Sequence, residues 1–147
     1  MKNYGEYRIF EGISGENLKT LTDCVTRGES VFNSGDVMFD EAHNPHICRM
    51  LLEGSAEAVA PCGKRFKISA GTVWGTGFFE DDRMPLITEI KALTECRTLE
   101  MDWNMMFEPC WFSCYFHALF IDNLERVKDA QYELIKQNND ENNSAKS

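Results

Sequence analysis

The sequence predicts a mainly β fold with flanking helices, in which eight antiparallel strands form a jelly-roll barrel and one long C-terminal helix follows. Two observations support this fold class. Between about residue 28 and residue 102, short segments of alternating apolar and polar residues follow one another, separated by turn-forming residues. Residues 110–138, by contrast, contain neither glycine nor proline and carry apolar side chains at helical spacing, which indicates one uninterrupted helix.

The length and composition of the chain exclude several classes of protein. Its 147 residues suit a single domain, and a formal net charge of −9 would repel the phosphates of a nucleic acid. No run of about 18 apolar residues predicts a membrane span, and the N-terminus lacks an apolar signal region. We therefore expect a cytoplasmic protein that has no membrane partner and keeps its six cysteines reduced.

The cysteine and histidine patterns predict neither a metal centre nor a catalytic site. Cys110 and Cys114 are spaced i, i+4 on the predicted long helix, where packing as small apolar side chains explains them best. His43 and His46 share one predicted loop but lack the acidic ligand of a cupin metal site. The sequence has no serine nucleophile elbow, metalloprotease helix or Walker loop. We expect no enzyme, no metal and no cofactor, with a cupin-type metalloenzyme as the least favoured alternative.

A short helix and eight strands precede the long helix. Ser14 predicts the start of the short helix, which should end near Cys24 and carries an apolar face that includes Leu21. The predicted strands are residues 29–32, 37–39, 48–53, 56–60, 64–68, 72–74, 86–93 and 97–102. In the last strand, alternation places Leu99 on the core face and Thr98 on the opposite face.

The segment from Thr72 to Asp102 contains the candidate site. It begins with a short apolar run into two glycines, Gly75 and Gly77, a residue type that allows backbone conformations closed to other residues. An acidic turn at residues 80–83 follows and ends at Pro85. The segment therefore predicts a strand, a glycine turn, a short cap and two further strands.

This order of elements resembles the phosphate-binding cassette of the cyclic-nucleotide-binding domain in the Crp/Fnr family of bacterial regulators. The match is carried by Trp74-Gly75-Thr76-Gly77 and, more closely, by the run from Ile90 to Arg97 with Leu99 and Asp102. Shorter matches extend over most of residues 6–137. The resemblance implies an effector domain that senses a small molecule.

The resemblance also implies the domain organisation. Residues 1–137 form the sensor domain, with the barrel at about 28–102 and the long helix at about 110–138, and residues 139–147 form a disordered polar tail. Regulators of the family continue into a helix-turn-helix domain, which these residues do not contain. The chain is either a natural single-domain protein or the sensor half of a longer regulator, and it would contact DNA only through that further domain.

At the positions that bind the nucleotide, the sequence departs from the family pattern. The resemblance places the family's ribose-binding glutamate on Thr76 and its phosphate-binding arginine and serine on Leu86 and Ile87. A buried phosphate needs a charged and preferably bidentate donor, which neither leucine nor isoleucine supplies. We therefore expect weak binding of cyclic AMP, or none.

The candidate pocket lies between the barrel and the long helix. Its lining residues are Trp74, Gly75, Thr76, Gly77, Phe78, Phe79, Arg83, Leu86 and Ile87. Mostly apolar walls with few polar groups suit a small hydrophobic or aromatic effector. Arg83 is a candidate contact for an anion, although pairing with Glu80 or Asp81 in solvent explains it more simply. A filled core that binds no ligand is a third possibility.

The long helix also carries the pattern of a coiled-coil seam. Phe120, Leu124, Val127, Gln131 and Leu134 recur at alternating spacings of four and three residues. A helix of about 28 residues is about 42 Å long, which exceeds what a small barrel covers. We therefore predict a parallel homodimer through this helix, as in the family; the alternative is a helix that lies on its own barrel.

The sequence thus predicts a ligand-sensing, dimerising regulatory domain of a Crp/Fnr-like transcription regulator with an unknown effector. The alternative is a protein-interaction module that dimerises and senses nothing.

Overall fold

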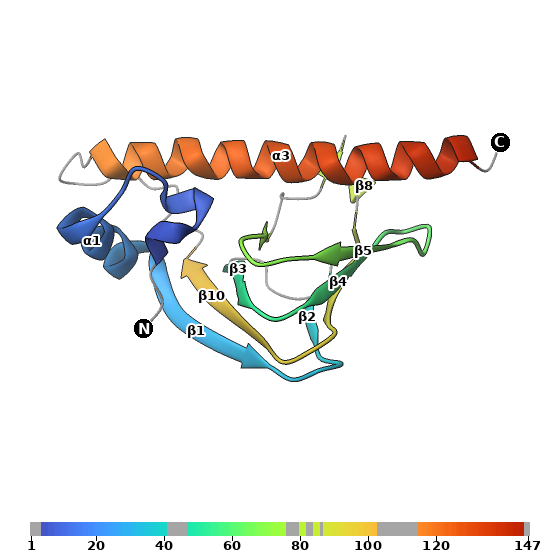
Figure 1. Cartoon of the computed structure of the whole chain (residues 1–147), viewed down its shortest axis with the longest axis horizontal. Coiled ribbons are helices and arrows are strands. Elements are labelled where there is room, and N and C mark those ends of the chain that lie inside the picture. Colours follow the sequence, from blue (N-terminus) through green and yellow to red (C-terminus); the bar gives the residue numbers. More distant parts are fainter. Residues whose placement is uncertain are drawn as a thin grey trace.

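The computed structural model describes residues 4–40, 47–75, 80–81, 84–85, 87–102 and 115–145. It confirms a mainly β architecture with flanking helices and a long C-terminal helix (Figure 1). The described elements are η1 (Tyr4–Glu6), η2 (Arg8–Phe10), α1 (Gly15–Val25), β1 (Thr26–Phe32), β2 (Val37–Asp40), β3 (Ile47–Glu53), β4 (Ala56–Val59), β5 (Arg65–Ile68), β6 (Val73–Trp74), β7 (Glu80–Asp81), β8 (Met84–Pro85), β9 (Glu89–Ala92), β10 (Cys96–Asp102) and α3 (Tyr115–Ala145).

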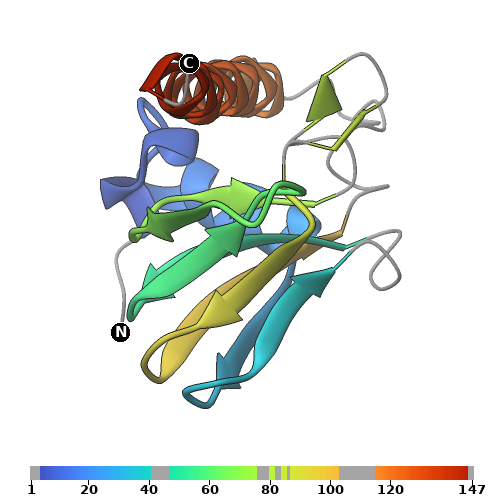
Figure 2. The same ribbon diagram turned by 90° about the vertical axis from the view of Figure 1, so that its right-hand side faces the viewer.

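Eight of these strands form two antiparallel sheets. The first sheet has the strand order β1-β10-β3-β6, and the second has the order β2-β9-β4-β5. Within the described part of the chain no strand pairing joins the two sheets, so the predicted closed barrel is corrected to a pair of four-stranded sheets. β7 and β8 form a separate two-stranded sheet that lies beside α3 (Figure 2).

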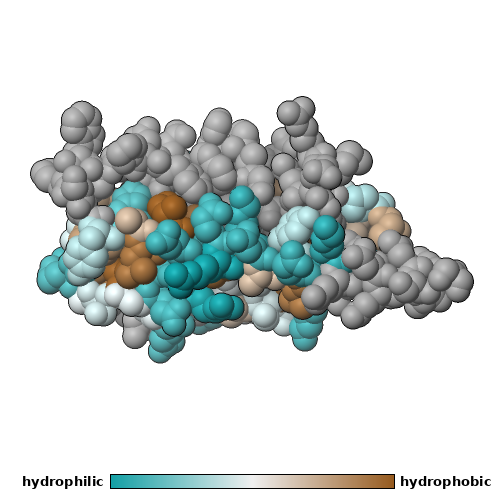
Figure 3. All heavy atoms as spheres, turned by 90° about the horizontal axis from the view of Figure 1, so that it is seen from above, coloured by the Kyte–Doolittle hydropathy of each residue, from teal (hydrophilic) through white to brown (hydrophobic). Residues whose placement is uncertain are grey.

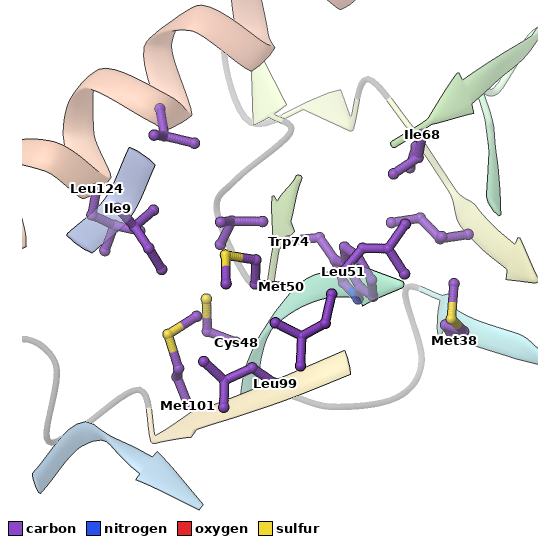
Figure 4. Close-up of a cluster of buried hydrophobic side chains, with 14 of the residues drawn as sticks. Ile9, Met38, Cys48, Met50, Leu51, Ile68, Trp74, Leu99, Met101 and Leu124 are labelled. Atoms are coloured by element: carbon purple, nitrogen blue, oxygen red, sulfur yellow. The ribbon is translucent and has the colours of Figure 1, made fainter. Parts of the chain in front are cut away.

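One cluster of buried side chains joins both sheets to the helices. In Figure 4, Trp74 lies beside Leu51 of β3, and Ile9 of η2 lies next to Leu124 of α3. The apolar face predicted for the short helix belongs to the same cluster at Leu21, which is buried. The core is therefore continuous from the strands to α3.

The alternation predicted for residues 97–102 fails at Thr98. Leu99 is buried as expected, but Thr98 is buried as well, and its hydroxyl group finds no hydrogen-bond partner in the described part of the chain. A bulge explains the difference, because the pairing of β10 with β3 skips Leu52 between Arg97 and Thr98. Single-strand periodicity does not reveal an irregularity that the neighbouring strand introduces.

The apolar stripe of α3 packs on the chain's own core. Phe120, Leu124 and Val127 are only 0%, 1% and 7% exposed, and Gln131 is hydrogen-bonded to β6. These four residues of the predicted dimer seam thus contact the chain's own core, whereas Leu134 remains 61% exposed, and dimerisation through this helix stays a prediction. The sheets and the N-terminal helices together extend along most of α3 (Figure 1), so the chain itself supplies an apolar surface for this stripe.

The segment around η2 fixes the first half of α3. The Phe10 and Phe120 rings stack with their centroids 5.6 Å apart. Asn123, which is only 4% exposed, donates hydrogen bonds from its Nδ2 to the carbonyl oxygens of Ile9 and Glu11, at 3.2 and 2.8 Å. This pairing satisfies a buried amide within an otherwise apolar contact.

The boundaries of α3 differ from the prediction. The helix continues to Ala145, so the disordered tail expected at residues 139–147 is corrected to helix over most of its length. The predicted start near residue 110 lies outside the described residues. None of the described helices combines the length and the apolar content that a membrane crossing requires.

Candidate functional site

Residues 73–88, called the candidate segment from here on, connect the two sheets. The segment leaves the first sheet at β6, an edge strand, and enters the second sheet at β9. Between them β7 pairs with β8, with Glu80 opposite Pro85 and Asp81 opposite Met84. The predicted short cap is therefore a small hairpin.

The structure describes three of the nine candidate pocket residues. Trp74 and Ile87 are 1% and 2% exposed and belong to the same core cluster, and Gly75 is buried. The other six lie outside the described residues: Thr76, Gly77, Phe78, Phe79, Arg83 and Leu86. Both ends of the segment are thus anchored in the core, and the roles predicted for these six residues stay predictions.

The indole N–H of Trp74 is buried and has no hydrogen-bond partner among the residues that the structure describes. Leaving a buried donor unsatisfied costs about 1–3 kcal/mol. Pairing of Trp74 with Arg49 of β3 fixes the backbone, and the ring lies inside the core cluster (Figure 4). The candidate segment therefore begins with one buried donor that an acceptor atom of a ligand would satisfy.

The segment re-enters the core at Ile87, and the following residue secures it. Both the backbone N–H and the hydroxyl of Thr88 donate to the carbonyl oxygen of Val59, at 2.7 and 3.2 Å. Val59 belongs to β4, which pairs with β9. The second end of the segment is therefore held by hydrogen bonds as well as by burial.

A side chain of α3 holds β6 in place. The backbone N–H of Val73 donates to Oε1 of Gln131, and Nε2 of Gln131 donates to the carbonyl oxygen of Val73, both at 2.8 Å. Sequence reasoning treated Gln131 as a polar interruption of a dimer seam and missed this role. The signal for it was a lone amide on an apolar helix face, since a buried amide needs partners.

A groove lies between β5 and α3, next to this contact. Its volume is about 300 Å³, and its walls are Arg65, Phe66, Lys67, Ile68, Ser69, Thr72, Gln131, Leu134 and Ile135. Thr72 directly precedes β6, so one end of the groove reaches the start of the candidate segment. Sequence reasoning did not predict this groove, because the spacing of residues 64–68 does not reveal which element lies beside them.

The described cysteines are free thiols. Burial raises the pKa of the Cys48 thiol, and the Arg49 charge offsets only part of that effect. Burial likewise raises the pKa of Cys96, although the thiol also contacts the carbonyl oxygens of Ser55 and Thr94. These two thiols therefore remain protonated at neutral pH. No group of potential metal ligands occurs among the residues that the structure describes.

Comparison with known sequences finds no matching family model and no matching curated protein. Similar solved structures do exist. A putative cyclic nucleotide-binding protein from Geobacter metallireducens superposes with a TM-score of 0.62 at 19% identity, covering 84% of this chain and 91% of that one.

Two further structures have larger chains. The regulatory subunit of a cAMP-independent protein kinase A from Trypanosoma brucei, as a triple mutant bound to cAMP, gives a TM-score of 0.64 at 17% identity and covers 91% of this chain and 48% of its own. The c-di-GMP-responsive regulator CLP from Xanthomonas campestris gives a TM-score of 0.64 at 10% identity, with coverages of 86% and 61%. The two sheets and the C-terminal helix of this chain therefore have the fold of cyclic-nucleotide-binding domains.

Proposed function

We propose that this chain is a ligand-sensing regulatory domain whose effector is a small apolar or aromatic molecule, in a transcription regulator of the Crp/Fnr kind. The observation that carries the proposal is the unpartnered indole N–H of Trp74 at the start of the candidate segment. An effector with an apolar body and one acceptor atom would satisfy this donor and suit its apolar surroundings. Contact with DNA would require a helix-turn-helix domain beyond these residues.

Cyclic AMP is not the expected effector, because Thr76, Leu86 and Ile87 stand where the family has its polar contacts. The Trypanosoma subunit supports this reasoning: it is described as cAMP-independent, and its cAMP-bound form carries an arginine in place of a threonine. We expect calorimetry to detect no binding of cyclic AMP to the wild type below about 1 mM. A double variant, Leu86→Arg with Ile87→Ser, should gain measurable affinity, whereas micromolar affinity of the wild type would contradict the proposal.

A signal from the candidate segment would reach α3 through the Gln131 contact. Val73 is the residue before Trp74, and both of its backbone polar groups are bonded to the helix. A ligand that moves Trp74 would therefore have to move or break this contact. In this proposal, binding shifts α3 between two positions according to the affinity of the ligand for each.

A thermal-shift screen with small aromatic and apolar metabolites tests the sensing function. A true effector at 100 times its Kd stabilises the wild type by about 2.7 kcal/mol. Trp74→Phe keeps an aromatic ring but removes the N–H donor, so the same effector should stabilise this variant less. An effector that stabilises both proteins equally would show that Trp74 is not its donor, and a screen without any effector would count against sensing.

The alternative, a module that only dimerises, needs a surface other than the predicted seam. The exposed charged side chains on the described part of α3 are mostly carboxylates: Asp122, Glu125, Asp129 and Glu133, with Arg126 as the exposed basic residue. Seen from the α3 side, hydrophilic groups occupy much of the middle of the described surface (Figure 3). Two parallel helices in contact through this face would bring like charges together. This charge pattern favours the sensor over the dimerisation module.

A further inference from the structure

The outer edge of β5 has free hydrogen-bonding groups. β5 is the last strand of the second sheet and pairs only with β4 among the described strands. The backbone N–H of Ala60 donates to the carbonyl oxygen of Lys64 at 2.8 Å. This bond shows which residue pairs of β4 and β5 are hydrogen-bonded to each other. Since hydrogen-bonded pairs alternate in antiparallel strands, the N–H and C=O groups of Phe66 and Ile68 point to β4, and those of Arg65 and Lys67 point outward.

These outward groups face the groove between β5 and α3. Arg65 and Lys67 line one wall, and Leu134 and Ile135 of α3 line the other. Leu134 is the most exposed large aliphatic side chain of the described residues, at 61%. A free strand edge beside an exposed apolar wall is the arrangement by which domains bind an extended peptide as an additional strand.

The charges along β5 indicate which peptide would fit. Arg65 and Lys67 project from the same face of the strand, in a chain whose formal net charge is −9. Arg65 forms an ion pair with Glu57 at 3.1 Å, whereas Lys67 forms none within the described part of the chain. Opposite charges on adjacent strands stabilise their pairing, so a strand added here would best carry acidic residues on this face.

A second copy of this chain fits the edge poorly. If β5 paired with β5 of another molecule, the two basic residues of each copy would lie against those of the other, and like charges directly opposite one another are destabilising. We therefore propose that the groove binds an extended acidic segment of a partner protein as a fifth strand of the second sheet. Its acidic residues would alternate with apolar residues that pack on Leu134 and Ile135.

Fluorescence polarisation with the wild-type protein tests this proposal. The probe is a labelled peptide of about eight residues in which glutamate and valine alternate. We expect saturable binding, about tenfold weaker binding to Lys67→Glu, and unchanged binding to Lys19→Glu, which reverses the same charge on α1 far from β5 (Figure 1). Circular dichroism of each variant verifies that it is folded.

Two control peptides separate strand addition from charge attraction alone. Methylating alternate backbone nitrogens of the probe removes the hydrogen bonds that a new strand needs and should abolish binding. A peptide of alternating lysine and valine should not bind. Equal binding of the methylated probe, equal binding of the lysine peptide, or absence of binding by the original probe would each overturn the proposal, as would a homodimer that Lys67→Glu dissociates.

Discussion

A single glutamine side chain joins the long helix to the strand beside the candidate site. Gln131 bonds to both backbone polar groups of Val73, which is buried. β6 has only two residues and lies at a sheet edge, so backbone pairing alone gives it little support. The side chain therefore replaces the neighbouring strand that β6 lacks on that side.

Gln131→Met tests this role because methionine has nearly the shape of glutamine but neither of its hydrogen-bonding groups. It would leave the N–H and C=O of Val73 without partners, and we expect the free energy of unfolding to fall by about 2 kcal/mol. Urea denaturation provides the measurement. Gln131→Glu keeps the acceptor and loses the donor, so its stability should lie between the other two; equal stability of Gln131→Met and wild type would show that the contact contributes nothing.

At Gly54 the sequence predicts the turn but not the tertiary contact that also requires glycine. Its place between two strands predicts a turn, and its φ of +103° agrees with that prediction. A second constraint comes from the tertiary structure: a Cβ atom here would overlap the carbonyl oxygen of Glu95 and approach Sγ of Cys96 at 2.9 Å. No local pattern reveals this contact, because Glu95 lies in a different turn.

Gly54→Ala should therefore destabilise the protein more than Gly63→Ala. Gly63 also has a positive φ, +90°, but a Cβ atom there meets nothing within 4 Å. We expect a cost of about 1 kcal/mol for the backbone strain at Gly63 and at least about 3 kcal/mol at Gly54. Thermal unfolding of the two variants measures the difference, and equal losses would contradict the predicted overlap.

One carboxylate, that of Glu100, links the neighbouring strands β1, β10 and β3 on one face of their sheet. Glu100 of β10 accepts hydrogen bonds from Ser30 at 2.6 Å and from Arg49 at 3.0 Å. Burial by itself would raise the pKa of Glu100, but these hydrogen bonds and the charges of Arg49 and Arg27 outweigh it and lower the pKa. The ionised carboxylate is therefore more favourable in the folded protein than in the unfolded chain.

This shift predicts how stability depends on pH. Because the folded-state pKa is lowered, the contribution of Glu100 is complete above its unfolded pKa of about 4.3 and is lost as the pH falls through the folded value. Glu100→Gln should therefore cost about 1–2 kcal/mol at pH 7 and less at pH 3. Urea titrations at both values test this. Glu133→Gln, at an exposed position on α3, is the control and should change little at either pH.

The sequence predicts the long helix but not the surface on which the helix packs. Apolar spacing correctly predicts its existence and the face that carries Phe120 and Leu124. The same spacing suits a second helix or the chain's own sheets equally well, since both are apolar surfaces. The choice depends on whether η2, α1 and the strands extend far enough along the helix, which periodicity does not reveal.

For the whole molecule, the resemblance of the motifs to a known family, together with the order of strands and turns, predicted the fold apart from the closed barrel. The similar solved structures share less than 20% of their residues with this chain, yet the match around Ile90–Arg97 identified the cyclic-nucleotide-binding-like fold. Closure into a barrel was not predictable, because it depends on hydrogen bonds between strands that are distant in sequence. Of the candidate pocket residues, Trp74 and Ile87 are buried in the core, and their role in binding a ligand stays a prediction.

We expect the charges on the exposed face of α3 to influence the oligomeric state. Phe120, Leu124 and Val127 are buried within one chain, and the exposed charged residues of α3 are mostly acidic, so we expect a monomer in sedimentation velocity at about 50 mM salt. Raising the salt to about 500 mM would screen the repulsion and allow weak association. A stable dimer at low salt would contradict this expectation and would support the dimerisation module instead.

The contact between Val73 and Gln131 spans 58 residues of sequence. A ribosome adds residues in order, so β6 leaves it well before the glutamine that completes its hydrogen bonds has been made. The outer backbone groups of β6 therefore remain solvated until synthesis of the long helix is well advanced. Completion of the strand at the candidate site is thus tied to a helix that is translated later.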